Sequence, residues 1–329
     1  MTSLMLDPPP QAGGRNRRLL RVLPAAVSLA IIAVAGTVLW RALGSIEFAD
    51  VARRFEAIPA VSITLAVLLT GTACLAVAAY EVAMLRHLKS GLPDRLAALT
   101  AFTAFPIGHA VGFGALSGGA VRYRIYSSAG LSAFSIGKVV VLSVFPFAMG
   151  LGLLCGLAFL ARSADGGRLL SLDARWVMLI GGALILLHAA YGAAVLRASG
   201  PVVLRGFEFE LPTPRLTAIQ YVLGLVEVLA AVGVLYVLLP ESAGTSFLPF
   251  AAAYVIAIVA GLLSSVPAGL GVFESMLLLM LRDLDPEALL GSVLAYRLIY
   301  ELVPFTLAIA LLLGWEGWSR RHLLGLGRS

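Results

Sequence analysis

Long apolar stretches alternate along this chain of 329 residues with short polar segments that are mostly basic. The stretches lie at about 22–42, 58–80, 138–160, 176–196, 216–240, 247–263 and 288–313. Each is close to the roughly 20 residues that a helix needs to cross ~30 Å of hydrocarbon. Because only helices satisfy the backbone along a lipid-facing span, the pattern predicts an all-α protein, a polytopic bundle of transmembrane helices.

Two further apolar segments, 96–121 and 264–281, are interrupted by proline and clustered glycine. Broken or re-entrant helices of this kind are tolerated where protein or a water-filled cavity surrounds them, and in transporters they mark the binding site. In both segments a glycine-rich break precedes a charged residue and then an apolar helix with a proline. These residues are Gly118, Gly119, Arg122 and Pro146 in the first, and Gly269, Gly271, Glu274 and Pro304 in the second. An internal repeat explains this order; the alternative is that glycine and proline are simply common in membrane helices.

The distribution of Lys and Arg distinguishes between topologies, because cytoplasmic loops are enriched in these residues. If the N-terminus is inside, 96–121 dips in and returns, and 266–281 crosses, then 15 of them lie inside and 6 outside. The split is 11 against 10 if 96–116 also crosses, and 13 against 8 if both irregular segments re-enter. The sequence therefore favours eight crossings of a bacterial inner membrane, with both termini inside.

Composition excludes a soluble domain of this size, since 60% of residues are hydrophobic, 13% are charged and the mean hydropathy is +0.96. The net charge of +6 then indicates basic cytoplasmic loops and not nucleic-acid binding. The sequence contains no phosphate-loop, nucleophile-elbow or zinc-protease motif, so no cofactor or metal is expected. The expected organisation is a disordered tail at 1–18, a transmembrane domain at 19–316 and a tail at 317–329, with 22–42 as a retained helix and not a signal peptide.

Charged residues inside apolar spans cost at least ~2.5–3.5 kcal/mol at the bilayer centre, so they usually face a cavity or a partner. Glu227 lies in the middle of YVLGLVEVLAAVGVLYVLL, with no basic residue within reach on its own helix. Arg297 and Glu301 are four residues apart, so they share a helix face and can neutralise each other. The functional alternative is that Arg297 binds an anionic head group, which Glu301 or Glu227 holds in place.

Arg122 and Arg124, in LSGGAVRYRIY, are candidates for binding phosphate, because arginine donates bidentate hydrogen bonds to it. The preceding pair Gly118 and Gly119 lets backbone amides approach a ligand and can open a helix N-terminus onto an anion. Tyr123 is expected at head-group level. The alternative is an ordinary basic loop held at the cytoplasmic surface.

Two other carboxylates interrupt or border apolar segments. Glu274 follows Pro267 and GLGVF, so it either polarises the site at a broken helix or only favours the N-terminal dipole of the next helix. Glu81 lies at the foot of the second span, near Arg86 and His87, and is expected in the membrane interface.

The segments FGALSGGAVRYRIYSSAGLS, SSVPAGLGVFES and YRLIYELVPF resemble the lysylphosphatidylglycerol synthase transmembrane family, and the resemblance covers about 20–315. The likeness is to the N-terminal flippase region of the bifunctional synthase/flippases, and small stand-alone inner-membrane relatives belong to the same broad family. The resemblance implies movement of an anionic or aminoacylated phospholipid, such as lysyl-phosphatidylglycerol, between leaflets, and resistance to cationic antimicrobial peptides. A chain that ends WSRRHLLGLGRS leaves no room for the soluble synthase domain, so no synthase activity is expected.

We therefore expect a flippase-like transporter whose partners are membrane phospholipids. A homo-oligomer of this chain is compatible with the sequence. The alternative is a membrane scaffold that docks a separately encoded lipid-modifying enzyme. The candidate substrate-binding residues are Gly118, Gly119, Arg122, Tyr123, Arg124, Glu227, Gly269, Gly271, Glu274, Arg297 and Glu301.

Overall fold

The computed structural model describes residues 58–111, 114–170, 172–197, 202–204, 207–209, 212–240, 244–264 and 267–323. The tail predicted at 1–18 and the helix predicted at 22–42 lie outside these residues. Within them the chain is helical, as predicted, apart from a short antiparallel pair of strands, β1 (Val202–Leu204) and β2 (Phe207–Phe209). The final helix continues to Leu323, beyond the predicted start of the C-terminal tail at 317.

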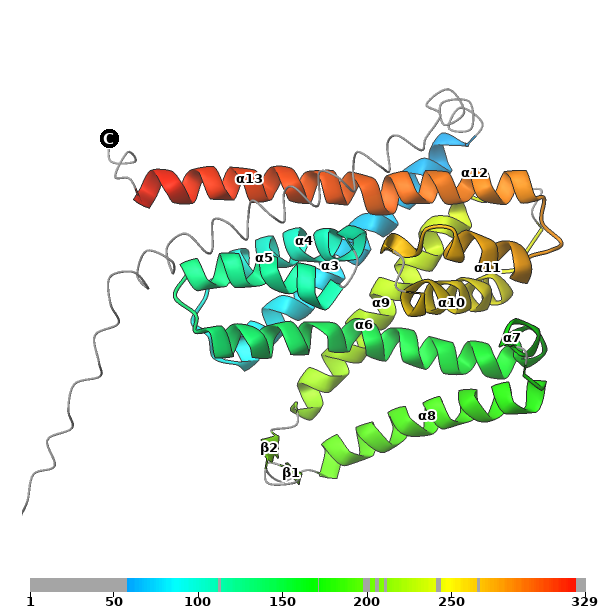
Figure 1. Cartoon of the computed structure of the whole chain (residues 1–329), viewed down its shortest axis with the longest axis horizontal. Coiled ribbons are helices and arrows are strands. Elements are labelled where there is room, and N and C mark those ends of the chain that lie inside the picture. Colours follow the sequence, from blue (N-terminus) through cyan, green and yellow to red (C-terminus); the bar gives the residue numbers. More distant parts are fainter. Residues whose placement is uncertain are drawn as a thin grey trace, which may run out of the picture.

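Five helical segments among the described residues are long and apolar enough to cross a membrane (Figure 1). They are α3 (Ala60–His87), α6 (Ala133–Ala161), α8 (Ala174–Arg197), α9 (Pro214–Val237) and a continuous segment of α12 (Pro286–Tyr296), the π-helix η3 (Arg297–Leu302) and α13 (Val303–Leu323). A short helix, α7 (Ser163–Leu170), joins α6 to α8. The chain is thus a multi-pass membrane protein, and the predicted count of eight crossings is not confirmed.

Local sequence signals define where several of these helices begin. Ser132 and Thr213 each accept a hydrogen bond from a backbone amide in the first turn of α6 and α9. Asp285 caps α12 in the same way. Proline occupies the first position of α9 and α12, where its missing amide costs nothing.

The first irregular segment forms a helical hairpin, as predicted for a segment that dips in and returns. Its arms are α4 (Asp94–Val111) and α5 (Gly114–Ser128), which pack against each other. Pro106 lies inside α4. The chain therefore leaves this hairpin at the end of the molecule where it entered (Figure 1).

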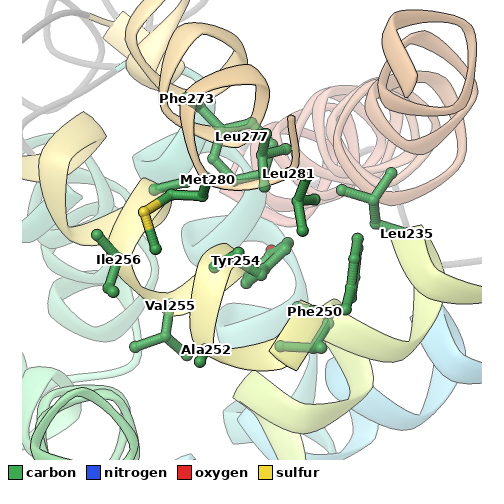
Figure 2. Close-up of a cluster of buried hydrophobic side chains, with 14 of the residues drawn as sticks. Leu235, Phe250, Ala252, Tyr254, Val255, Ile256, Phe273, Leu277, Met280 and Leu281 are labelled. Carbon is green, nitrogen blue, oxygen red and sulfur yellow. The ribbon is translucent and has the colours of Figure 1, made fainter. Parts of the chain in front are cut away.

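The second irregular segment also belongs to a hairpin, which corrects the favoured topology. Its arms are α10 (Phe247–Leu263) and α11 (Val272–Met280), joined through the 3-10 turn η2 (Pro267–Gly269). The nine residues of α11 rise about 14 Å, less than half of a bilayer core, so this helix is too short to make the crossing favoured for 266–281. Instead α11 packs back onto α10, and Figure 2 shows Leu277 and Leu281 beside Tyr254.

The two hairpins enter from opposite ends of the molecule and their tips approach each other in the middle (Figure 1). The contact between α4 and η2 joins the two tips. Each hairpin precedes a long helix that contains a proline, Pro146 in α6 and Pro304 in α13. This order of elements agrees with the proposed internal repeat, which stays a prediction.

The basic residues still divide between the two ends of the molecule as in the favoured topology. The reason is that the hairpin of α10 and α11 returns the chain to the side it left, just as two crossings would. The α3–α4 connection, the end of α8 and the start of α9 lie at one end of the molecule (Figure 1). That end carries Arg86, Lys89, Arg95, Arg197 and Arg215, whereas the other carries Arg162, Arg175 and Arg282.

Close packing of α6 against α9 fixes the centre of the bundle. A Cβ atom on Gly224 would lie only 1.9 Å from the Pro146 carbonyl oxygen, and one on Gly150 would lie 2.4 Å from the Gly224 backbone. Only glycine permits this approach. By contrast, α8 carries exposed apolar side chains such as Trp176 and Leu186, as expected of a lipid-facing helix.

Candidate functional site

A cavity of about 500 Å³ lies between the two hairpin tips, and α3, α6 and the π-helix region complete its wall. Ala104 and Gly108 line it from α4, and Gly261 and Gly269 line it from the second hairpin. Most lining residues are apolar. The polar ones are Tyr80, His109, Arg122, Ser143, Tyr296 and Glu301. A largely apolar cavity with a few convergent polar groups is typical of a small-molecule site.

Arg122 is held in the cavity wall by Glu81 of α3. Its Nε and Nη2 donate to the Glu81 carboxylate at 2.9 and 2.8 Å, and the Tyr126 hydroxyl donates to the same carboxylate at 2.9 Å. Glu81 is fully buried and Arg122 is only 7% exposed through its side chain. A bidentate pair of this kind fixes the plane of the guanidinium group.

The remaining nitrogen of Arg122, Nη1, donates no hydrogen bond to the described residues. Gly118, one turn earlier on α5, brings the α4 backbone close, since a Cβ there would lie 2.9 Å from the Ala104 oxygen and 3.3 Å from Nη1. The geometry therefore leaves one guanidinium nitrogen available to a ligand in the cavity.

A second arginine, Arg297 of η3, is bound by two carboxylates. Its Nε donates to Glu274 at 2.6 Å and its Nη1 to Glu301 at 2.9 Å, and Nη1 also lies 3.3 Å from the carbonyl oxygen of Ala268. Its Nη2 is buried with no hydrogen-bond partner among the described residues. The predicted pairing of Arg297 with Glu301 is confirmed.

This second cluster ties the hairpin tips to the long C-terminal helix. Glu274 belongs to α11 and Ala268 to η2, whereas His109 of α4 lies 3.9 Å from Glu301 through its Nε2. Glu274 also accepts a hydrogen bond at 2.8 Å from the amide of Gly271. It therefore fills both roles considered for it, as a helix cap and as a charged partner within the site.

Arg122 and Arg124 do not share a site. Two residues apart on a helix, they point in directions that differ by about 200°. Arg124 pairs with Glu316 of α13 at 2.7 Å and lies over the ring of Trp315 at 5.2 Å. Tyr123, between them, packs against an apolar cluster. Of the arginines predicted to bind phosphate, Arg122 alone lines the cavity within the part of the chain described.

The predicted glycine breaks differ in structure. Gly118 and Gly119 lie inside α5, which begins at Gly114, so they do not open a helix N-terminus as expected. They serve close packing instead, because a Cβ on Gly119 would meet Val140 at 3.2 Å. Gly269 and Gly271 do lie at a break, with φ of +61° and +80°, which glycine adopts without strain.

Glu227 is completely buried in the middle of α9 and is not among the residues that line the cavity. Neither carboxylate oxygen makes a hydrogen bond of normal geometry within the described residues, and the Tyr80 hydroxyl is the polar group that faces the carboxylate. Glu227 thus lies behind Tyr80 of the cavity wall and forms no ion pair with Arg122 or Arg297.

Sequence reasoning missed the role of Glu81, which is paired in the interior and not placed in the interface. The signal was present, because Glu81 is embedded in the apolar run AAYEVAML. His109, Tyr80 and Tyr296 of the cavity wall carry no local signal of that kind.

Comparison with known proteins shows relatives with related membrane segments. No family model matches the chain. An uncharacterized protein of Synechocystis, slr0712, is 32% identical over 231 residues, which are 68% of this chain and 70% of the relative. The inner membrane protein YbhN of Escherichia coli is 24% identical over 61% of this chain and 64% of its own length. Phosphatidylglycerol lysyltransferase of Staphylococcus aureus is 26% identical over 302 residues, 90% of this chain.

The chain belongs to the lysylphosphatidylglycerol synthase transmembrane family. It covers only 34% of the length of the lysyltransferase, however, so the activity of that whole enzyme does not follow from the similarity. Membership supports a membrane role that concerns lipids.

Proposed function

We propose that this protein is a lipid translocase that moves an anionic or aminoacylated phospholipid, such as lysyl-phosphatidylglycerol, between the leaflets of the bacterial inner membrane. The observation that carries the proposal is the central cavity, whose walls are mostly apolar and which holds a buried arginine with a free Nη1. Arginine suits a phosphodiester because its planar fork matches phosphate oxygens.

The polar groups of the cavity suit a head group in two parts. Arg122 offers a donor to phosphate, whereas Glu301 offers a carboxylate to an amine. The apolar walls formed by residues such as Phe105 and Phe147 suit the first part of the acyl chains. Transfer of an aminoacylated lipid to the outer leaflet would lower its negative charge and so reduce the binding of cationic antimicrobial peptides.

A translocation assay tests the proposal. The full chain is reconstituted into vesicles of phosphatidylglycerol and phosphatidylethanolamine with a fluorescent phosphatidylglycerol, and dithionite reduces the label in the outer leaflet. We expect faster loss of inner-leaflet label than in empty vesicles. If no anionic lipid tried moves faster in these vesicles than in empty ones, the protein is not a translocase. Recovery of a lipid-modifying enzyme with the purified protein would favour a scaffold.

Variants connect the activity to the cavity. Arg122→Met combined with Glu81→Leu removes both charges of the first pair and keeps a similar volume, and we expect it to lose translocation. Arg124→Ala is the matched control, since it removes a paired arginine from the same helix but outside the cavity. Equal loss in both variants would show that the cavity is not the route.

A further inference from the structure

A line of buried polar side chains runs along one face of α9. Thr217, Gln220 and Glu227 follow the spacing of three and four residues that keeps positions on one helix face, with Gly224 between the last two. All three polar side chains are buried, and Gln220 and Glu227 are fully inaccessible. The line begins one turn into α9, at the end of the molecule that carries Arg86 and Lys89 (Figure 1).

None of these side chains has its hydrogen bonds satisfied by the described residues. Thr217 Oγ1, both amide atoms of Gln220 and both carboxylate oxygens of Glu227 lack a partner. Buried polar groups in native proteins are almost always paired, with protein or with ordered water. The face is not a continuous route for water, because Gly224, between Gln220 and Glu227, packs against the Pro146 carbonyl with no room for a methyl group.

Glu227 differs from the other buried carboxylates of the described chain. The buried Glu81 and Glu316 and the partly buried Glu274 and Glu301 each pair with an arginine. An unpaired carboxylate in this position costs several kcal/mol as an ion, so the group is held in its neutral form in this conformation. A carboxylate that must be protonated in this conformation can bind and release a proton when its surroundings change.

The surroundings of Glu227 connect it to the cavity. The titratable groups that face it are Cys74 and Tyr80 of α3 and Tyr300 of η3. Among the described residues, α6, α8, α10 and α12 bring no charged side chain to it. Tyr80 lines the central cavity, so a change of charge on Glu227 alters the electrostatic potential at the cavity wall.

A small pocket provides a second connection. It has a volume of about 10 Å³, close to the space that one water occupies, and both Cys74 and Tyr300 line it. On its other side it is lined by His109 and Glu301, which belong to the Arg297 cluster.

We propose that Glu227 is a proton-binding site that loads and releases a proton during the transport cycle, reached from the central cavity past Tyr80. The carboxylate takes a proton from water in the cavity while the cavity faces one side of the membrane, and returns it after the hairpin tips rearrange. Release leaves a negative charge beside Tyr80 and Tyr300 and so changes the balance of charge at the cavity. This inference rests on the translocase function proposed above.

The test uses the full chain in vesicles, with a pH difference imposed across the membrane and fluorescent phosphatidylglycerol as the probe. We expect the wild-type rate of translocation to change with the direction of the pH difference. Glu227→Gln, which is close to isosteric, loses that dependence. Glu287→Gln, an exposed glutamate on α12, keeps it. A response to pH in Glu227→Gln equal to that of the wild type overturns the inference.

Tyr80→Phe keeps the carboxylate but removes the hydroxyl that faces it from the cavity wall, and we expect it to slow the response to pH. An unchanged response in this variant overturns access from the cavity.

Infrared difference spectra between acid and alkaline pH give a readout that does not depend on transport. We expect a band from a buried carboxylic acid in the wild type and in Glu287→Gln, and its loss in Glu227→Gln. If the band is present but no lipid moves, the translocase function fails and the proton site stands. If lipid moves but the band is absent, the proton site fails and the translocase function stands.

Discussion

Arg122 belongs to the first hairpin and Arg297 is bound to the second, and the two are neutralised differently. Arg122 pairs with one carboxylate, Glu81, so the first cluster has no net charge. Arg297 pairs with both Glu274 and Glu301, so this arginine and its two carboxylates carry one excess negative charge. The difference suggests a division of labour in the cavity, with phosphate near Arg122 and a positively charged amine near Glu301.

The two clusters also differ in how much of the fold depends on them. Glu81 and Arg122 lock α3 to α5 through a single fully buried pair. The contacts of the second cluster come from α11, η2, η3 and α4, so the loss of one side chain leaves the other contacts in place. Removal of a partner is therefore expected to cost more in the first cluster.

The largest expected effect is that of Glu81→Ala. It leaves the Arg122 guanidinium buried without a carboxylate, and breaking a buried pair in this way costs about 3–5 kcal/mol. Thermal and denaturant unfolding in detergent micelles measure it. The double variant Glu81→Leu with Arg122→Met is the control, because it leaves no unpaired charge and should recover most of the loss. Equal destabilisation by the single and the double variant would show that packing, and not charge, dominates at this site.

A smaller effect is expected for Glu274→Gln, which keeps an acceptor for the Gly271 amide but removes the charge that faces Arg297. Hydrogen bonds to charged groups contribute about 1.5–3 kcal/mol, and Glu301 still neutralises Arg297. Because the excess negative charge disappears, the variant should lose preference for lysyl-phosphatidylglycerol over phosphatidylglycerol. Competition between the two lipids in the translocation assay measures that preference, and an unchanged preference would contradict the division of labour.

The parts of the site that could be predicted are those that depend on local spacing. Arg297 and Glu301 are four residues apart on one helix, and the structure pairs them. Proline and clustered glycine predicted that both irregular segments are interrupted helices, and in the structure both segments belong to helical hairpins. Helix periodicity and the cost of breaking the backbone in lipid are sufficient for such predictions.

The missed parts depend on how each helix is rotated about its axis. Glu81 and Arg122 are 41 residues apart, and Glu274 and Arg297 are 23 apart. Nothing in the sequence of α3 says which of its faces meets α5. For the same reason the sequence does not show whether 266–281 crosses the membrane, since its apolar character is the same whether it faces lipid or packs on α10.

The smallest expected effects separate the two kinds of glycine in the hairpins. Gly271 has φ of +80° and ψ of −37° with open space around it, so Gly271→Ala should cost about 1–3 kcal/mol from backbone strain alone. Asparagine occurs at positive φ more often than alanine, so Gly271→Asn should recover part of the loss. Gly118 lies in a regular helix 2.9 Å from the Ala104 oxygen at its ideal Cβ position, so the cost there comes from crowding.

At Gly118 the order of the two substitutions should therefore reverse. Gly118→Asn adds more atoms against α4 than Gly118→Ala and should be the less stable of the two. Thermal unfolding of the four variants in the same micelles decides the matter. If asparagine is the better substitute at both positions, the first hairpin also contains strained backbone, and the contrast drawn between the hairpins fails. If alanine is better at both, the break at Gly271 is relieved in solution by a rearrangement of the second tip.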